Sequence, residues 1–383
     1  MEIIGNIENA SNPFAVKSKA TQGAVARKPL RGLDNRARNI QVKASFKEKP
    51  QLRSAKENVK VTKAFQGKSV KAQLGVKKEA LQNIAELQAC LPCLESYSTG
   101  RLPEDVEDID AADSENPQLV SCYIKEIYGY MKALEAIFPI QKVHLQSQPE
   151  ITGKMRSVLV DWLVQVHLRF HLLQETLYMT VSILDRYLQA DKVKRSQLQL
   201  AGVTAMFIAS KYEEMYAPDI SDFVFITDTT YSKQEILQME KSILKNLDFN
   251  LSKPLPLHFL RRNSKAANVD AMIHALAKYL MEMALPEYEL AHCLPSLLAA
   301  ASLYLSLRLL TDATWSDTLK FYSGYTEEEV VPVVKKLCQV IVDSEKSKLQ
   351  AIRLKYSSNK LFKISTIPQL KSPLVIELAG TKK

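Results

Sequence analysis

Apolar residues recur at helical spacing along most of the chain between positions 154 and 355. The helix expected over residues 155–170 is apolar nearly all round, which is typical of a helix buried on most sides. One of its stripes consists of Met155, Val158, Leu159, Trp162 and Val166. A helix with two apolar faces can pack into a core with one and offer the other to a partner. Periodicity alone favours the simpler interpretation that both faces belong to the core.

Two further segments, 195–214 and 294–310, are apolar on most sides and rich in small residues, which predicts buried helices at close approach. Each is followed by a similar hexapeptide, YSKQEI beginning at Tyr231 and YTEEEV beginning at Tyr325. Both hexapeptides contain capping boxes, Ser232 with Glu235 and Thr326 with Glu329. Prolines at 254 and 256 separate the two halves. We interpret the halves as two helical bundles of one fold, the alternative being a chance recurrence of a common cap.

The first part of the chain has a different character. Residues 1–80 contain 18 Lys or Arg and 6 Asp or Glu, against 33 and 36 in the remainder, so the basic charge belongs to this segment and the rest is nearly neutral. Its polar composition predicts disorder. Residues 104–115 carry seven acids and no base, which predicts a solvated linker, with helical periodicity beginning at about Gln118.

The composition narrows the class of protein. The chain has 383 residues, 46% of them hydrophobic, and only 11 glycines, which suits a large helical core. No apolar run is long enough to predict a membrane span, and no secretory signal is visible. Five irregularly spaced cysteines indicate a reducing compartment.

Candidate catalytic and metal-binding motifs are weak. His167 and His171 have the i, i+4 spacing of zinc ligands, but Leu168 stands where a metalloprotease needs Glu, so structural or surface histidines are favoured. Cys90 and Cys93 form one C-x-x-C pair, which cannot close a tetrahedral zinc site alone. No phosphate-binding or nucleophile motif occurs. An enzyme, for instance a hydrolase that uses either histidine, remains one alternative.

Several segments together carry a resemblance: KMRSVLVDWLVQVH, ETLYMTVSILDRYL, LQLAGVTAMFIASKYEE and ILQMEKSILKNLDFNLSKPLPLHFLRR. They resemble the cyclin box of mitotic cyclins, and the similarity, from about Gln118 to Leu370, looks like that of the B type. It implies an all-α fold of two tandem five-helix cyclin folds with an extra N-terminal helix. The expected divisions are a disordered arm with an acidic linker at 1–116, the first fold at 117–253, the second at 254–370 and a tail at 371–383.

The resemblance also implies binding residues by position. The kinase-binding set is Lys211, Glu240, Ile208, Tyr212, Leu244, Phe249 and Leu251. A patch that docks R-x-L segments of substrates and inhibitors matches Met155, Val158, Leu159, Trp162 and Gln199, with valine at 158 where the family usually has isoleucine. A pocket for phosphorylated partners matches Arg261, His274 and Lys278. For the two opposite charges, Lys211 and Glu240, an intramolecular salt bridge is the alternative, and for the phosphate pocket a solvated basic face.

The N-terminal arm contains two short motifs of the family. Residues 27–35 fit the destruction box R-x-x-L-x-x-x-x-N through Arg27, Leu30 and Asn35. Residues 56–58 fit a KEN box through Lys56, Glu57 and Asn58. Unstructured backbone is what a ubiquitin ligase receptor can grip. Leu81, Ile84, Leu87 and Leu91 fit a nuclear-export segment, although an ordinary amphipathic helix is favoured.

The resemblance implies a regulatory subunit without catalytic residues, metal or cofactor. It would bind and activate a mitotic cyclin-dependent kinase as a heterodimer, direct substrate choice at the G2/M transition, and be degraded through the anaphase-promoting ubiquitin ligase and the proteasome at mitotic exit. We expect it in cytoplasm and nucleus, changing with the cell cycle, and expect no nucleic-acid partner. A nucleic-acid-binding protein of the same fold is the other alternative, but it would need basic charge on the folded part.

Overall fold

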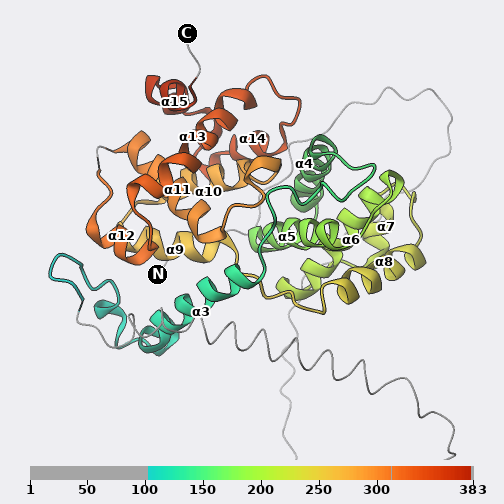
Figure 1. The fold of residues 1–383 in the computed structure, drawn as a ribbon, viewed down its shortest axis with the longest axis horizontal. Coiled ribbons are helices and arrows are strands. Elements are labelled where there is room, and N and C mark those ends of the chain that lie inside the picture. The colour runs from blue at the N-terminus through green and yellow to red at the C-terminus, as the bar shows by residue number, and fades with distance from the viewer. Residues whose placement is uncertain (1–101, 312, 381–383) are drawn as a thin grey trace, which may run out of the picture. The chain divides into compact units, whose positions relative to one another are not determined.

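The computed structural model describes residues 102–311 and 313–380, and every regular element in them is a helix (Figure 1). Helix α3 (Ile124–Ile137) precedes two bundles. The first consists of α4 (Gly153–Arg169), α5 (Gln174–Ala190), α6 (Leu198–Glu213), α7 (Ile220–Ile226) and α8 (Lys233–Asn246). The second consists of α9 (Pro256–Ala266), α10 (Ala271–Met283), α11 (Pro295–Leu310), α12 (Asp317–Ser323) and α13 (Glu327–Ser344), and is followed by α14 (Ala351–Tyr356) and α15 (Pro373–Leu378). The predicted all-α fold of two five-helix units with an extra N-terminal helix is therefore confirmed.

Each bundle is built around one helix that is buried nearly all round, α6 in the first and α11 in the second. Helices α4, α5 and α8 pack against α6, and helices α9, α10 and α13 pack against α11. Small residues allow the close approach. A Cβ added at Gly202 of α6 would lie 2.9 Å from Cδ2 of Leu159 on α4, so the two helices meet where residue 202 has no side chain.

The similarity between the two halves extends to hydrogen bonds that the sequence alone does not reveal. Both predicted capping boxes form, since Glu235 accepts from Ser232 N–H at 2.8 Å and Glu329 accepts from Thr326 N–H at 2.8 Å. The tyrosine before each cap then bonds to the start of the buried helix of its own bundle. Tyr231 donates to the carbonyl of Ser196 at 2.9 Å, and the Tyr325 hydroxyl lies 2.6 Å from the Ser296 hydroxyl.

The acidic segment before α3 contacts the second bundle, so the prediction of a solvated linker is wrong at Asp110, whereas five of its seven acids are exposed as predicted: Glu104, Asp105, Glu107, Asp108 and Glu115. Asp110 is 8% exposed and both its carboxylate oxygens accept from Arg262 of α9, at 2.5 and 2.6 Å. The Tyr322 hydroxyl of α12 donates to the Glu107 carbonyl at 3.1 Å and accepts from the Ile109 N–H at 3.4 Å. Composition predicted solvation because it cannot show that Asp110 pairs with Arg262, a buried residue far away in the sequence.

The expected tail, 371–383, contains α15, which packs on α13 and buries Val375. The two prolines of the linker precede and begin α9, with Pro256 at its first position, where a missing N–H costs no hydrogen bond. Among the described helices, none combines the length and the apolar character needed to cross a lipid bilayer.

Candidate binding surfaces

The predicted pair of kinase-binding charges lies on two packed helices of the first bundle. Lys211 is in the last turn of α6 and Glu240 is in the middle of α8, and the ammonium group donates to the carboxylate. The Lys211 ammonium also lies 4.2 Å from the ring centroid of Phe207. The side chain of Lys211 is 44% exposed and that of Glu240 is 12% exposed. In the chain alone the two charges therefore form an intramolecular ion pair, with the lysine still open to a partner.

The apolar side chains assigned to the same surface divide into exposed and covered ones. Tyr212 and Phe249 are 55% and 70% exposed, and Leu244 and Leu251 are half-buried. Phe249 has a left-handed backbone conformation with φ of 57°. Ile208 is only 3% exposed and belongs to the core of the first bundle, so it supports this surface from below.

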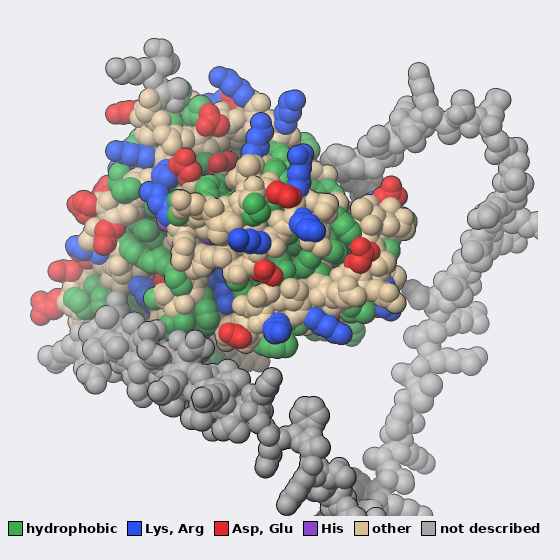
Figure 2. All heavy atoms as spheres, turned by 45° about the vertical axis from the view of Figure 1, so that its right-hand side comes forward, with side chains coloured by type: hydrophobic (Ala, Val, Ile, Leu, Met, Phe, Trp, Pro, Cys, Tyr) green, Lys and Arg blue, Asp and Glu red, His purple; other side chains and the backbone are tan. Residues whose placement is uncertain are grey.

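Sequence reasoning missed three of the most exposed apolar side chains on these elements. Met215 and Tyr216, in the loop after α6, are 88% and 87% exposed, and Phe225 of α7 is 68% exposed. Large exposed apolar side chains that gather on neighbouring elements mark an interaction surface. Met215 and Tyr216 stand together in a polar loop, where no helical periodicity identifies them. On the face drawn in Figure 2, apolar side chains reach the surface between interspersed acids and bases.

The predicted substrate-docking patch lies on α4 and the start of α6. Val158 is 54% exposed, and Met155, Trp162 and Gln199 are half-buried. Leu159 is 6% exposed because its side chain packs over Gly202, so it contributes to the α4–α6 interface. The apolar stripe of α4 is thus partly core and partly surface. Leu159 therefore belongs to the core, as one interpretation of the helix predicted, and Val158 is open to a partner, as the other predicted.

The predicted phosphate pocket brings together three groups of the second bundle. The pKa of His274 is lowered to about 4, chiefly by burial and further by the charges of Lys278 on α10 and Arg261 on α9. The His274 Nδ1 atom lies 2.8 Å from the hydroxyl of Ser264, a residue that sequence reasoning missed. Burial also lowers the pKa of Lys278. Lys278 has no hydrogen-bond partner among the described residues.

Two acids next to this pocket were also missed. Glu175, in the first turn of α5, accepts a hydrogen bond from the Arg261 guanidinium, which joins the first bundle to the second. Glu282 of α10 is fully buried and accepts from Lys355 at 2.7 and 2.8 Å and from Tyr356 at 2.8 Å. The partners of these acids come from distant parts of the chain, which is why sequence spacing gives no signal for them.

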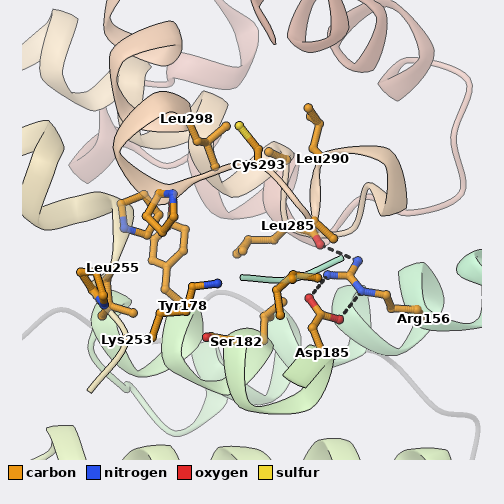
Figure 3. Close-up of a pocket in the computed structure, with 17 residues that line it drawn as sticks. Arg156, Tyr178, Ser182, Asp185, Lys253, Leu255, Leu285, Leu290, Cys293 and Leu298 are labelled. Carbon is orange, nitrogen blue, oxygen red and sulfur yellow. Dashed lines mark hydrogen bonds and ion pairs between the residues drawn. The ribbon is translucent and has the colours of Figure 1, made fainter. Parts of the chain in front are cut away.

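A small cavity of about 80 Å³ lies between the bundles and the linker (Figure 3). At one side Arg156 of α4 holds Asp185 of α5 through two hydrogen bonds of 2.5 and 2.6 Å, and also donates to the carbonyls of Leu285 and Pro286 of the second half. Burial alone would raise the pKa of Asp185, but the charge and hydrogen bonds of Arg156 lower it to about 2. Lys253 also lines the cavity, and burial lowers its pKa to about 8.

The two histidines considered for catalysis or metal binding, His167 and His171, do not lie on one helix. Helix α4 ends at Arg169, so His171 lies beyond it in a left-handed conformation with φ of 54°, and the expected i, i+4 pair on one helix is wrong. His167 is buried, and its Nε2 lies 3.0 Å from the Leu173 carbonyl. In the part of the chain that the structure describes, no three His, Cys, Asp or Glu side chains converge as a metal site would require.

The remaining sequence predictions lie outside the described residues. These are the destruction box at Arg27, Leu30 and Asn35, the KEN box at Lys56, Glu57 and Asn58, the pair Cys90 and Cys93, and the candidate export segment at Leu81, Ile84, Leu87 and Leu91.

Comparison with known families matches both bundles. Residues 126–252 match the family described as "Cyclin, N-terminal domain", and residues 254–370 match "Cyclin, C-terminal domain". A solved viral cyclin from herpesvirus saimiri is similar in fold, with a TM-score of 0.51 and 23% identity over 55% of this chain and 96% of that one. The fold and its two domains therefore define a cyclin.

Relatives of known type narrow the class further. The chain is 59% identical over 273 residues to the G2/mitotic-specific cyclin-B of Patella vulgata, covering 71% of this chain and 67% of the relative. It is 46% identical over 387 residues to the G2/mitotic-specific cyclin-B of Marthasterias glacialis, covering 98% and 96%. The chain belongs to the family of G2/mitotic-specific B-type cyclins.

Proposed function

We propose that the chain is the regulatory subunit that binds and activates a mitotic cyclin-dependent kinase and carries no catalytic centre of its own. The observation that carries this proposal is the surface around Lys211 and Glu240. There, an ion pair on two packed helices lies among exposed side chains that include Tyr212 and Phe249. A helix of the kinase can pack on the apolar side chains, and the two charges can hydrogen-bond its backbone. Better affinity for the active kinase conformation would shift the kinase population towards it.

The test is a kinase assay reconstituted from purified components. Replacing Lys211 and Glu240 together with alanine should abolish activation, because both polar contacts to the kinase backbone are lost. The matched control replaces Lys336 and Glu289, an exposed ion pair of the second half, with alanine. Circular dichroism should show unchanged helix content in both variants. Full activation by the Lys211→Ala/Glu240→Ala variant would overturn the assignment of this surface.

We also propose that the patch on α4 directs substrate choice by docking R-x-L segments of substrates and inhibitors. Its support is the exposed Val158 between half-buried apolar neighbours. Val158→Asp should slow phosphorylation of an R-x-L substrate and leave a substrate without that segment unaffected. Leu168→Asp, at a 38% exposed position of the same helix, is the control. Equal rates on both substrates in the Val158→Asp variant would exclude the patch.

The phosphate pocket of Arg261, His274 and Lys278 is proposed to bind phosphorylated partners. Its support is the proximity of three basic side chains, of which Lys278 lacks a hydrogen-bond partner among the described residues. A phosphate group accepts bidentate hydrogen bonds from arginine and is attracted by a lysine ammonium. Arg261→Ala should therefore weaken binding of a phosphopeptide.

Two further proposals concern the degradation and the localisation of the protein. We propose that residues 27–35 and 56–58 direct degradation through the anaphase-promoting ubiquitin ligase at mitotic exit, and that the protein occupies cytoplasm and nucleus in turn. Deleting both motifs should prolong the half-life of the protein in cells leaving mitosis. An unchanged half-life would show that the arm is not a degradation signal.

A further inference from the structure

In the predicted phosphate pocket, Arg261 already pairs with a carboxylate of the same chain. Glu175 reaches from the first turn of α5, in the first bundle, and accepts a hydrogen bond from the Nη2 atom of Arg261. The Arg261 side chain is 54% exposed and that of Glu175 is 18% exposed. Burial alone would raise the pKa of Glu175, but the hydrogen bond and charge of Arg261 lower it, so the acid is ionised at neutral pH.

The other acid near the pocket cannot take this role. Glu282 is fully buried and is already bound by Gln174, Lys355 and Tyr356. Its charge is therefore balanced inside the protein. Lys278, by contrast, has no hydrogen-bond partner among the described residues. Arg261 is thus paired with an acid of the chain, whereas the ammonium group of Lys278 is available to a ligand.

We infer that Glu175 is an internal competitor that sets the strength of anion binding at this pocket. The inference rests on the proposed function of the pocket as a site for phosphorylated partners. A bound phosphate displaces the Glu175 carboxylate from Arg261 and takes over its hydrogen bonds, while Lys278 adds a second contact. Because the Arg261 side chain is 54% exposed and lies at the surface, the pair can open without loss of the fold.

This arrangement determines which anions bind. A phosphate monoester carries a charge of about −1.5 to −2 at neutral pH and offers three acceptor oxygens. A carboxylate side chain carries a single charge and offers no more to Arg261 than Glu175 already does. Phosphate therefore displaces Glu175, whereas an aspartate or glutamate of a partner does not. Replacement of a phosphorylated serine by glutamate in a partner should accordingly fail to support binding.

The test uses the full chain and short peptides of glycine and alanine with one central phosphoserine, serine or glutamate. Binding is measured by titration, followed by phosphorus NMR for the phosphopeptide and by fluorescence anisotropy of labelled peptides. Glu175→Gln keeps the shape of the side chain and removes its charge. It should raise the affinity for the phosphopeptide about two- to fivefold, the factor expected when a partly exposed ion pair no longer competes. It should also give the glutamate peptide measurable binding.

Two further variants separate the possible results. Glu289→Gln, which removes the carboxylate of an exposed ion pair with Lys336 outside the pocket, should leave the affinities unchanged. Arg261→Ala should abolish binding. If neither the parent chain nor Glu175→Gln binds the phosphopeptide, the proposed pocket is wrong. If the parent chain binds through Arg261 but Glu175→Gln has the same or weaker affinity, the pocket stands and the competitor role of Glu175 is overturned, because a residue that merely positions Arg261 would lose affinity when replaced.

Discussion

Replacing Arg156 with methionine removes a buried charge that links the first bundle to the second half of the chain. Arg156 is 1% exposed, and Asp185 beside it is 3% exposed. Its guanidinium makes two hydrogen bonds to Asp185 and one each to the carbonyls of Leu285 and Pro286. Methionine fills most of the same volume but donates no hydrogen bond. The Leu285 carbonyl then loses this donor, and Asp185 keeps only His144, whose Nε2 lies 3.5 Å from the carboxylate. The Pro286 carbonyl still accepts from the Ser157 hydroxyl at 2.7 Å.

The expected loss of stability follows from this geometry. Removing one member of a buried ion pair costs about 3–5 kcal/mol, because the remaining charge stays buried without its main partner. The pair also makes a pH-dependent contribution. A folded-state pKa of about 2 for Asp185, below the ordinary aspartate value of 3.8, stabilises the fold by about 2 kcal/mol above pH 4. That part is lost as pH falls through the window from 3.8 to about 2.

The assay is urea unfolding followed by circular dichroism, at neutral pH and at a series of acidic pH values. Arg156→Met should lose stability at neutral pH by about the amount above, and its difference from the parent chain should shrink between pH 4 and pH 2. The double variant Arg156→Met/Asp185→Leu should recover part of the loss, because no charge is left unpaired. Lys336→Met, which breaks an exposed pair, should change stability by less than about 1 kcal/mol. A loss below that value in Arg156→Met would refute the reasoning.

Three further predictions concern packing, titration and the N-terminal segment. Gly202→Ala should cost about 1–3 kcal/mol in unfolding experiments, because the added Cβ overlaps Leu159. Buried His167 has its pKa lowered to about 4 from 6.5, chiefly by burial, so only the unfolded chain binds its proton and stability should fall as pH drops through that window; His167→Gln should flatten the slope. Asp110→Ala leaves Arg262 unpaired, and limited proteolysis should then cut within residues 102–116 faster than in the parent chain.

Much of the fold is determined by the sequence alone. Helix period, two capping boxes and paired prolines predict where the main helices begin and where the chain divides in two, because these signals depend on residues within one or two turns of each other. The cyclin box was recognised separately, from the resemblance of the residues around Trp162 and Lys211 to those of mitotic cyclins. The assignment of Arg261, His274 and Lys278 to a phosphate pocket likewise rests on the resemblance of these positions to B-type cyclins.

Only the tertiary structure shows which helix faces are buried and which charged side chains pair with one another. Periodicity placed Ile208 and Leu159 on apolar faces, but packing against neighbouring helices buried them both. Asp110 and Arg262 are 152 positions apart, and Glu175 and Arg261 are 86 apart, so no spacing rule connects them. The energy of such contacts depends on burial and distance in space, which the order of residues along the chain does not specify.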